Sequence, residues 1–154
     1  MLDLRSGAAE IPGEGPIALH DPIGGPIAVA LAEELGDRAI LITPDNIAGN
    51  ELSRSGDLAP ANVRLQQRGV RIERRSILRT VTEAHVVVED RFTGERRTID
   101  AVALVDCGFG LPNDELATTV AHPVLVAGDA VAPRTYLEAI LQGRRAALAV
   151  DAHR

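Results

Sequence analysis

A strand–turn–helix–strand pattern between residues 17 and 42 constrains the fold more than any other feature. An apolar run at 17–19 leads into a turn rich in Gly and Pro, and apolar residues then recur at helical spacing from Ile27 to Leu35. Gly36 favours the end of that helix, and a second apolar run at 39–42 follows at once. Two strands joined by one helix are expected to lie parallel in one sheet. The chain is therefore predicted to be an α/β protein.

The rest of the chain predicts further strands and two helices. The segment 43–60 carries Pro and Gly and predicts a loop. The segment 85–99, with Thr93-Gly94-Glu95 as its turn, predicts a β-hairpin. The remaining predicted elements are a helix at 61–68, strands at 101–106 and 123–127, and a final helix ending near Val150. The segments 70–74 and 77–81 are either two strands or one interrupted strand. Together they predict a Rossmann-like parallel sheet with flanking helices and a hairpin or meander.

The turn after the first strand is a candidate dinucleotide site. Such a turn has the pattern Gly-x-Gly-x-x-Gly or Ala, in which the second position admits the pyrophosphate and the third lets helix and strand pack closely. The corresponding positions here are Ile23, Gly25 and Ala28, so only the first departs from the pattern. Asp45, after the second strand, is a candidate for binding a ribose. The alternative is a βαβ unit that keeps the fold without the ligand.

A second candidate site lies at Gly128-Asp129, directly after the predicted strand 123–127. Thr135 and Glu138 have the spacing of a capping box, which predicts a helix that starts at this point. A helix N-terminus offers free N–H groups to a phosphate, and an Asp at a strand end accepts hydrogen bonds from sugar hydroxyls. The alternative is that Asp129 only satisfies the loop backbone.

Charge and cysteine content exclude several classes of function. The 154 residues carry a net charge of −6, which argues against nucleic acid and acidic lipid as partners. A single cysteine excludes an internal disulfide. No apolar run reaches the roughly 18 residues of a membrane span, and the first residues do not resemble a signal peptide. We therefore expect a cytoplasmic protein that is not bound to a membrane.

No catalytic set or metal site can be assembled from the spacing of the reactive residues. Cys107 follows an apolar run, which favours a buried, inert thiol over a Cys–His pair with His122. A basic cluster, with Glu73 and Glu83 nearby, either forms a solvated strand face or contacts a phosphate or partner: Arg71, Arg74, Arg75 and Arg79. The other histidines lack metal-ligand spacing: His20, His85 and His153. We expect no catalytic residue and no metal in this chain.

Two segments together resemble a known enzyme family. These are residues 17–43, and residues 105–147, which contain Asp-Cys-Gly-x-x-Leu-Pro-Asn-Asp, Gly-Asp-Ala-x-x-Pro-Arg-Thr and Gly-Arg-Arg-Ala-Ala in that order. They resemble the C-terminal half of the 2,4-dienoyl-CoA reductase / trimethylamine dehydrogenase family. Those enzymes join an old-yellow-enzyme barrel, which holds FMN and an iron–sulfur cluster, to nucleotide-binding domains of the glutathione reductase type. The resemblance covers roughly residues 12–150.

The resemblance implies a domain division and a set of binding residues. Residues 1–13 would be a linker or tail, 14–104 an NAD(P)H-binding-type domain, and 105–154 the returning segment of an FAD- or ADP-binding-type domain. The barrel, the cluster cysteines and the outgoing piece of that second domain have no counterpart in the sequence, so the chain looks like a C-terminal fragment. The residues matched to the family's nucleotide sites are Gly24, Gly25, Ala28, Gly128, Asp129, Arg134 and Thr135.

The expected function is therefore that of a nucleotide-binding portion of a flavin-dependent oxidoreductase, of the ene-reductase or amine dehydrogenase type. It would bind FAD or ADP, and also NAD(P)H if Ile23 is tolerated, and work with an FMN barrel of the same enzyme without turnover of its own. The alternative is a non-catalytic docking or assembly module with a vestigial nucleotide site. Because the strand predicted at 123–127 lacks its family partners, it would join the first sheet or leave an open edge, and we expect self-association.

Overall fold

The computed structural model describes residues 9–152, which form two compact units. The N-terminal unit runs up to Gly108 and the C-terminal unit starts at Phe109. The predicted boundary between residues 104 and 105 falls inside a strand of the N-terminal unit, β7 (Ala103–Asp106). That boundary stays a prediction about the longer family fold.

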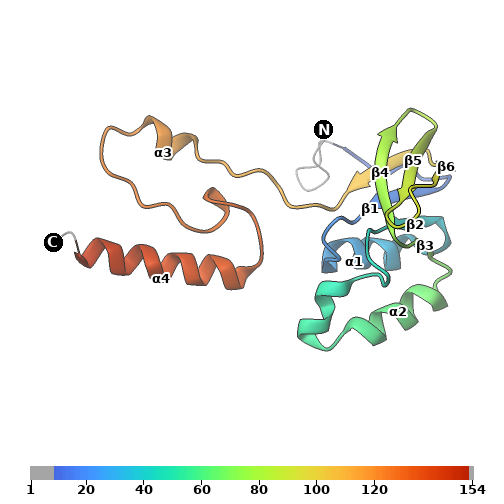
Figure 1. The fold of residues 1–154 in the computed structure, drawn as a ribbon, viewed down its shortest axis with the longest axis horizontal. Helices are drawn as coiled ribbons and strands as arrows, with labels where there is room; N and C mark the ends of the chain where they lie inside the picture. The colour runs from blue at the N-terminus through green and yellow to red at the C-terminus, as the bar shows by residue number, and fades with distance from the viewer. Residues whose placement is uncertain (1–8, 153–154) are drawn as a thin grey trace. The chain divides into compact units, whose positions relative to one another are not determined.

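The N-terminal unit is built on a four-stranded parallel sheet in the order β3-β2-β1-β7 (Figure 1). β1 (Ile17–His20) pairs in parallel with both β2 (Ala39–Ile42) and β7. The helix between the first two strands is α1 (Pro26–Leu35), as the spacing predicts. β3 (Arg71–Glu73) pairs with β2 and follows α2 (Leu58–Gln67). The predicted α/β class is confirmed.

Three antiparallel strands form a second sheet, in the order β4-β5-β6. β5 (His85–Asp90) and β6 (Arg96–Asp100) are the predicted hairpin, and β4 (Ser76–Val81) lies on its other side. Val86, Val88 and Asp90 of β5 are buried, whereas the residues that alternate with them are half-buried, as expected of a strand with one face on a core. The predicted hairpin is confirmed.

The parallel sheet is covered on both faces because its strand residues alternate between two cores. Ile17, Leu19 and Leu41 pack with α1 and α2 in one cluster. Their neighbours in the strands, including Ala18 and Ile42, pack against the hairpin sheet in the other cluster. Burial on both faces explains why β1 and β2 are continuous apolar runs and not alternating ones. The unit therefore has three layers, with the parallel sheet in the middle.

The C-terminal unit contains two helices joined by a long irregular segment. These are α3 (Glu115–Thr119) and α4 (Tyr136–Ala152), and α4 starts directly after Thr135 as predicted. The predicted strand 123–127 is wrong: Ala127 has extended backbone, but the segment pairs with no strand in the described part of the chain. A strand needs a neighbour for its N–H and C=O groups, and this segment has none among the described residues.

The apolar side chains of the C-terminal unit are largely exposed. From Phe109 to Val150 none of the described residues is buried. Leu111 is 92% exposed, and Tyr136 is 81% exposed at the start of α4. Within the described residues, no helix of either unit is long and apolar enough to cross a bilayer.

Candidate functional site

The residues predicted to bind a nucleotide fall into two groups, one in each unit. Four of them, Gly24, Gly25, Ala28 and Asp45, lie in the N-terminal unit. The other four, Gly128, Asp129, Arg134 and Thr135, lie in the C-terminal unit. Each group is a separate candidate site.

The first group surrounds the turn between β1 and α1. Gly24 has a φ of +67°, and Gly25 is the N-cap of α1. Ala28 is fully buried against the sheet, which is the packing role of the third position in a dinucleotide-binding turn. Both glycines are buried as well, so neither offers an open surface to a ligand. The turn therefore combines a left-handed glycine with a glycine N-cap, and both are covered by other residues.

Asp21 is the residue of this turn that the sequence reasoning missed. It directly follows β1, is 0% exposed, and accepts a hydrogen bond from the Gly25 N–H on Oδ1 at 3.1 Å. Its Oδ2 is buried without a hydrogen-bond partner in the described part of the chain. Burial raises the pKa of Asp21, against the opposing effect of the Gly25, Ile23 and Gly24 amides, and the nearby charge of Asp45 adds to the rise. An acidic residue directly after the first strand was the available signal.

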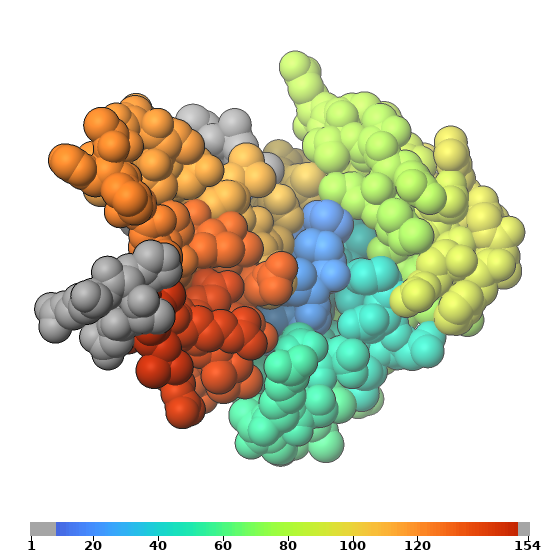
Figure 2. Space-filling model, turned by 60° about the vertical axis from the view of Figure 1, so that its left-hand side comes forward, coloured from blue at the N-terminus to red at the C-terminus, as the bar shows by residue number. Residues whose placement is uncertain are grey.

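The loop after β2 covers the turn from its other side. The Glu51 N–H donates to the Gly24 carbonyl at 3.0 Å. A Cβ on Gly24 would lie 2.9 Å from the backbone nitrogen of Asn50 and 3.2 Å from Asp45 Oδ2. In the space-filling view the blue residues of the first strand and helix lie beside the cyan residues that follow (Figure 2). A dinucleotide pyrophosphate needs exposed amides here, so the residues present do not fit it.

The carboxyl ends of β1 and β7 place further titratable groups near the turn. His20 Nδ1 lies 3.1 Å from Asp106 Oδ1, which also accepts a hydrogen bond from the Gly108 N–H. Cys107 is buried, and burial raises the pKa of its thiol to about 12, with smaller contributions from Asp21 and Asp106. A thiol with this pKa is not a nucleophile at neutral pH, which agrees with the predicted inert cysteine. His153 lies outside the described residues.

The second group forms an exposed loop before α4. Gly128 has a φ of +69°, and its N–H donates to Gln142 Oε1 on α4 at 2.7 Å, which fixes the loop against the helix. The Thr135 hydroxyl donates to the Glu138 carboxylate within the first turn of α4. The exposed Asp129 and Arg134 have no hydrogen bond to other described residues. A carboxylate and a guanidinium are therefore free to meet a ligand here.

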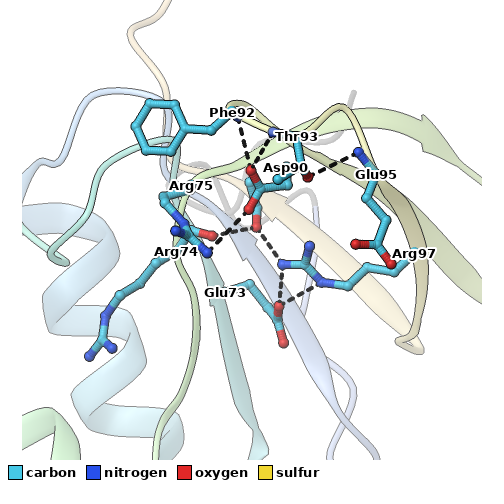
Figure 3. A network of polar contacts seen from close by, with 9 residues as sticks. Glu73, Arg74, Arg75, Asp90, Phe92, Thr93, Glu95 and Arg97 are labelled. Atoms are coloured by element: carbon cyan, nitrogen blue, oxygen red, sulfur yellow. Dashed lines mark hydrogen bonds and ion pairs between the residues drawn. The ribbon is translucent and has the colours of Figure 1, made fainter.

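The arginines between Arg71 and Arg79 are mostly engaged within the protein. Arg71 pairs with Glu73 and Arg79 with Glu89, at 2.7 Å each. Figure 3 shows the centre of the network, where Arg97 contacts Glu73 at 2.6 Å. Burial tends to raise the pKa of Glu73, but the hydrogen bonds from Arg97 and Arg71 outweigh burial and hold this pKa below its usual range. These contacts tie β6 to β3 and favour the structural interpretation of the basic cluster.

A shallow groove lies elsewhere, between α2 and β3. It has a volume of about 390 Å³ and contains none of the predicted site residues. The residues that line the groove include Asn62, Val63, Gln66, Ile72 and Arg74.

In the described residues there is no group of three or more His, Cys, Asp or Glu side chains that would hold a metal ion.

Known proteins resemble this chain in fold and not closely in sequence. No protein-family model and no curated protein sequence matches it. Histamine dehydrogenase from Rhizobium sp. 4-9 matches 85% of this chain with a TM-score of 0.78 and 20% identity. The 6-hydroxypseudooxynicotine amine oxidase of Pseudomonas geniculata N1 matches 94% with a TM-score of 0.79 and 18% identity. A 2-naphthoyl-CoA reductase matches 90% with a TM-score of 0.69 and 16% identity.

These matches extend through most of this chain but cover only a small part of each solved structure. The chain spans 22%, 23% and 21% of the length of the three proteins, respectively. Likeness at this level of identity establishes the fold alone. The chain therefore has the fold of a segment found in a dehydrogenase, an amine oxidase and a reductase, all of them oxidoreductases.

Proposed function

We propose that this chain is a nucleotide-binding portion of a flavin-dependent oxidoreductase of the 2,4-dienoyl-CoA reductase / trimethylamine dehydrogenase type. The observation that carries the proposal is the fold match to histamine dehydrogenase and the amine oxidase, which covers 85% and 94% of this chain. A match of that extent includes residues of both units. It agrees with the order of motifs on which the sequence resemblance rests.

The nucleotide is bound by the segment from Gly128 to Thr135, as ADP or as the ADP portion of FAD. Asp129 is exposed and suited to accept hydrogen bonds from ribose hydroxyls. Arg134 is exposed two residues before α4, whose N-terminus attracts a phosphate. Glu138 lowers that attraction in the first turn, so we expect Arg134 to provide most of the positive charge. The chain itself supplies binding and orientation.

The reacting centre of the enzyme would lie on its barrel and not on the residues of this chain. A flavin supplies hydride and electron transfer when bound, and the family resemblance places FMN and an iron–sulfur cluster on the barrel. The one cysteine described here is buried with a pKa of about 12. We therefore expect no turnover by this chain alone, in an enzyme whose barrel is its partner.

We expect the isolated chain to self-associate through the exposed apolar residues of its C-terminal unit and not through an open strand edge. The C-terminal unit exposes apolar residues along α4, including Leu137, Ile140 and Leu148, and has no buried residue of its own up to Val150. Apolar surface of this kind is normally covered by a partner. In the full enzyme the remainder of the nucleotide-binding domain covers it, and in the isolated chain a second copy does.

A docking or assembly module is the second candidate function. It is favoured by one observation, the buried Asp21 carboxylate in the glycine turn, because a nucleotide site does not need an acid there. In this case both nucleotide sites are vestigial. The two candidates differ in whether any nucleotide binds.

Calorimetric titration of the purified chain with ADP and FAD tests the proposal. We expect micromolar binding that is lost in Asp129→Ala and retained in Asp114→Ala, a matched control at another exposed aspartate of the same unit. Loss of binding in both variants would indicate a general charge effect and not a site at Asp129. No binding of either nucleotide to the wild-type chain would refute the nucleotide-binding role and leave the docking module.

A further inference from the structure

The glycine turn before α1 contains a buried carboxyl group of its own. Asp21 is wholly buried and accepts the Gly25 N–H at 3.1 Å. The backbone N–H groups of Ile23 and Gly24 also interact with this carboxylate. Successive amides at a helix N-terminus are the groups that a glycine-rich turn offers to a dinucleotide pyrophosphate. A side chain of the protein therefore takes up the amides that a phosphate would need.

The charges around the turn oppose a phosphate as well. Asp45 Oδ2 lies 3.2 Å from the position of a Cβ on Gly24, and its charge contributes to the raised pKa of Asp21. Asp106, paired with His20, lies at the carboxyl end of the adjacent strand β7. Arg91 provides a positive charge 4.0 Å from Asp45. Three carboxylates at one end of the sheet repel the two charges of a pyrophosphate.

Neutral groups close the remaining approach to the glycines. The side chain of Ile23 lies 3.1 Å from the position of a Cβ on Gly25, so it covers that glycine. Glu51 donates its backbone N–H to the Gly24 carbonyl, and Asn50 packs on Gly24. Charge and steric closure thus act at the same two residues.

We propose that the Asp21 carboxylate is the resident anion of this turn and that it excludes pyridine dinucleotides from the N-terminal unit. The exclusion of pyridine dinucleotides does not depend on the proposed function. The assignment of the segment 128–135 as the site for an adenine nucleotide without nicotinamide rests on it. The βαβ unit is then retained for its packing and not for a ligand.

Amide NMR spectra of the full chain test this residue by residue. We expect NADPH, NADH and inorganic pyrophosphate, each at millimolar concentration, to leave the Gly24 and Gly25 signals unmoved. In Asp21→Asn the Gly25 amide proton should shift upfield, because a bond to a charged acceptor becomes a bond to a neutral one. Asp37→Asn, at an exposed aspartate of the same unit, should leave that signal in place.

Two results would overturn the proposal. One is a saturable movement of the Gly24 and Gly25 signals with NADPH in the wild-type protein. The other is a folded Asp21→Asn protein whose Gly25 signal is unchanged. If Asp21→Asn does not fold, the wild-type titration decides alone. Failure of ADP to move the signals of residues 128–135 counts against the proposed function and leaves this inference standing.

Discussion

Replacing Gly24 by alanine tests how tightly the loop after β2 covers the glycine turn. Gly24 has a φ of +67°, a conformation that costs an L-residue about 1–2 kcal/mol. The new Cβ would also lie 2.9 Å from the backbone nitrogen of Asn50, which cannot move without the loop. Overpacking of this kind costs about 1–3 kcal/mol. The two contributions give an expected loss of about 2–5 kcal/mol in the free energy of unfolding.

Gly94→Ala is the matched control for the backbone contribution. Gly94 has a φ of +73°, but a Cβ there would meet no atom within 4 Å. We therefore expect a loss of about 1–2 kcal/mol, from the left-handed conformation alone. The difference between the two variants isolates the contact between Gly24 and Asn50.

Urea denaturation followed by circular dichroism measures both variants against the wild-type chain. The reasoning requires Gly24→Ala to be clearly the more destabilising of the two. Equal losses would mean that the loop 44–51 moves away freely. In that case the turn is not closed from this side, and only Asp21 and Ile23 remain to exclude a ligand.

Four further predictions follow from burial and charge. Leu41→Ala, at a wholly buried position of β2, should lower the free energy of unfolding by about 2–5 kcal/mol in the same assay. Burial raises the folded pKa of Asp21, so the stability of its protonated form is present below the unfolded pKa and is lost as the pH rises through the folded pKa. Asp21→Asn should therefore be the more stable protein above the folded pKa and lose that advantage in acid. Glu73 has a lowered pKa, so its contribution to the free energy of unfolding is present above the unfolded pKa near 4.5 and is lost as the pH falls through the folded pKa. In pH-dependent melting, the melting temperature of Glu73→Gln should therefore fall less steeply in acid than that of the wild-type chain. Cys107 should react with iodoacetamide far more slowly in the native protein than in urea, as measured by mass spectrometry.

The elements that the sequence predicted correctly are those specified by local patterns. The βαβ unit and the hairpin follow from apolar spacing and from glycine turns. The helix α2 begins at Leu58 and not at Ala61 as predicted, because its first turn includes Pro60, a residue that favours loops in a sequence pattern. Proline is tolerated in the first turn of a helix, where its missing N–H has no intrahelical partner.

The errors concern features that depend on distant parts of the chain. The segment 123–127 has a strand-like composition, but strand formation depends on a neighbour that composition does not reveal. The loop predicted at 43–60 contains a short 3-10 helix, Asn50–Ser55. Its first residue, Asn50, packs on Gly24, from which it is separated by 26 positions in the sequence. Asp21 could be seen in the sequence but not its complete burial, which depends on neighbours such as Ile42 of β2, whose carbonyl accepts the Asp21 N–H.

The conformation of Gly24 has a consequence for how such turns are interpreted in evolution. Its left-handed backbone and its contact with Asn50 both demand glycine, with or without a nucleotide. Purifying selection for folding alone would therefore preserve this glycine long after a binding activity was lost. A search that scores glycines in a strand–turn–helix motif will keep reporting a cofactor site in such descendants. The residue four positions before the helix N-cap, here Asp21, distinguishes a turn that binds a nucleotide from one that does not better than the glycines do.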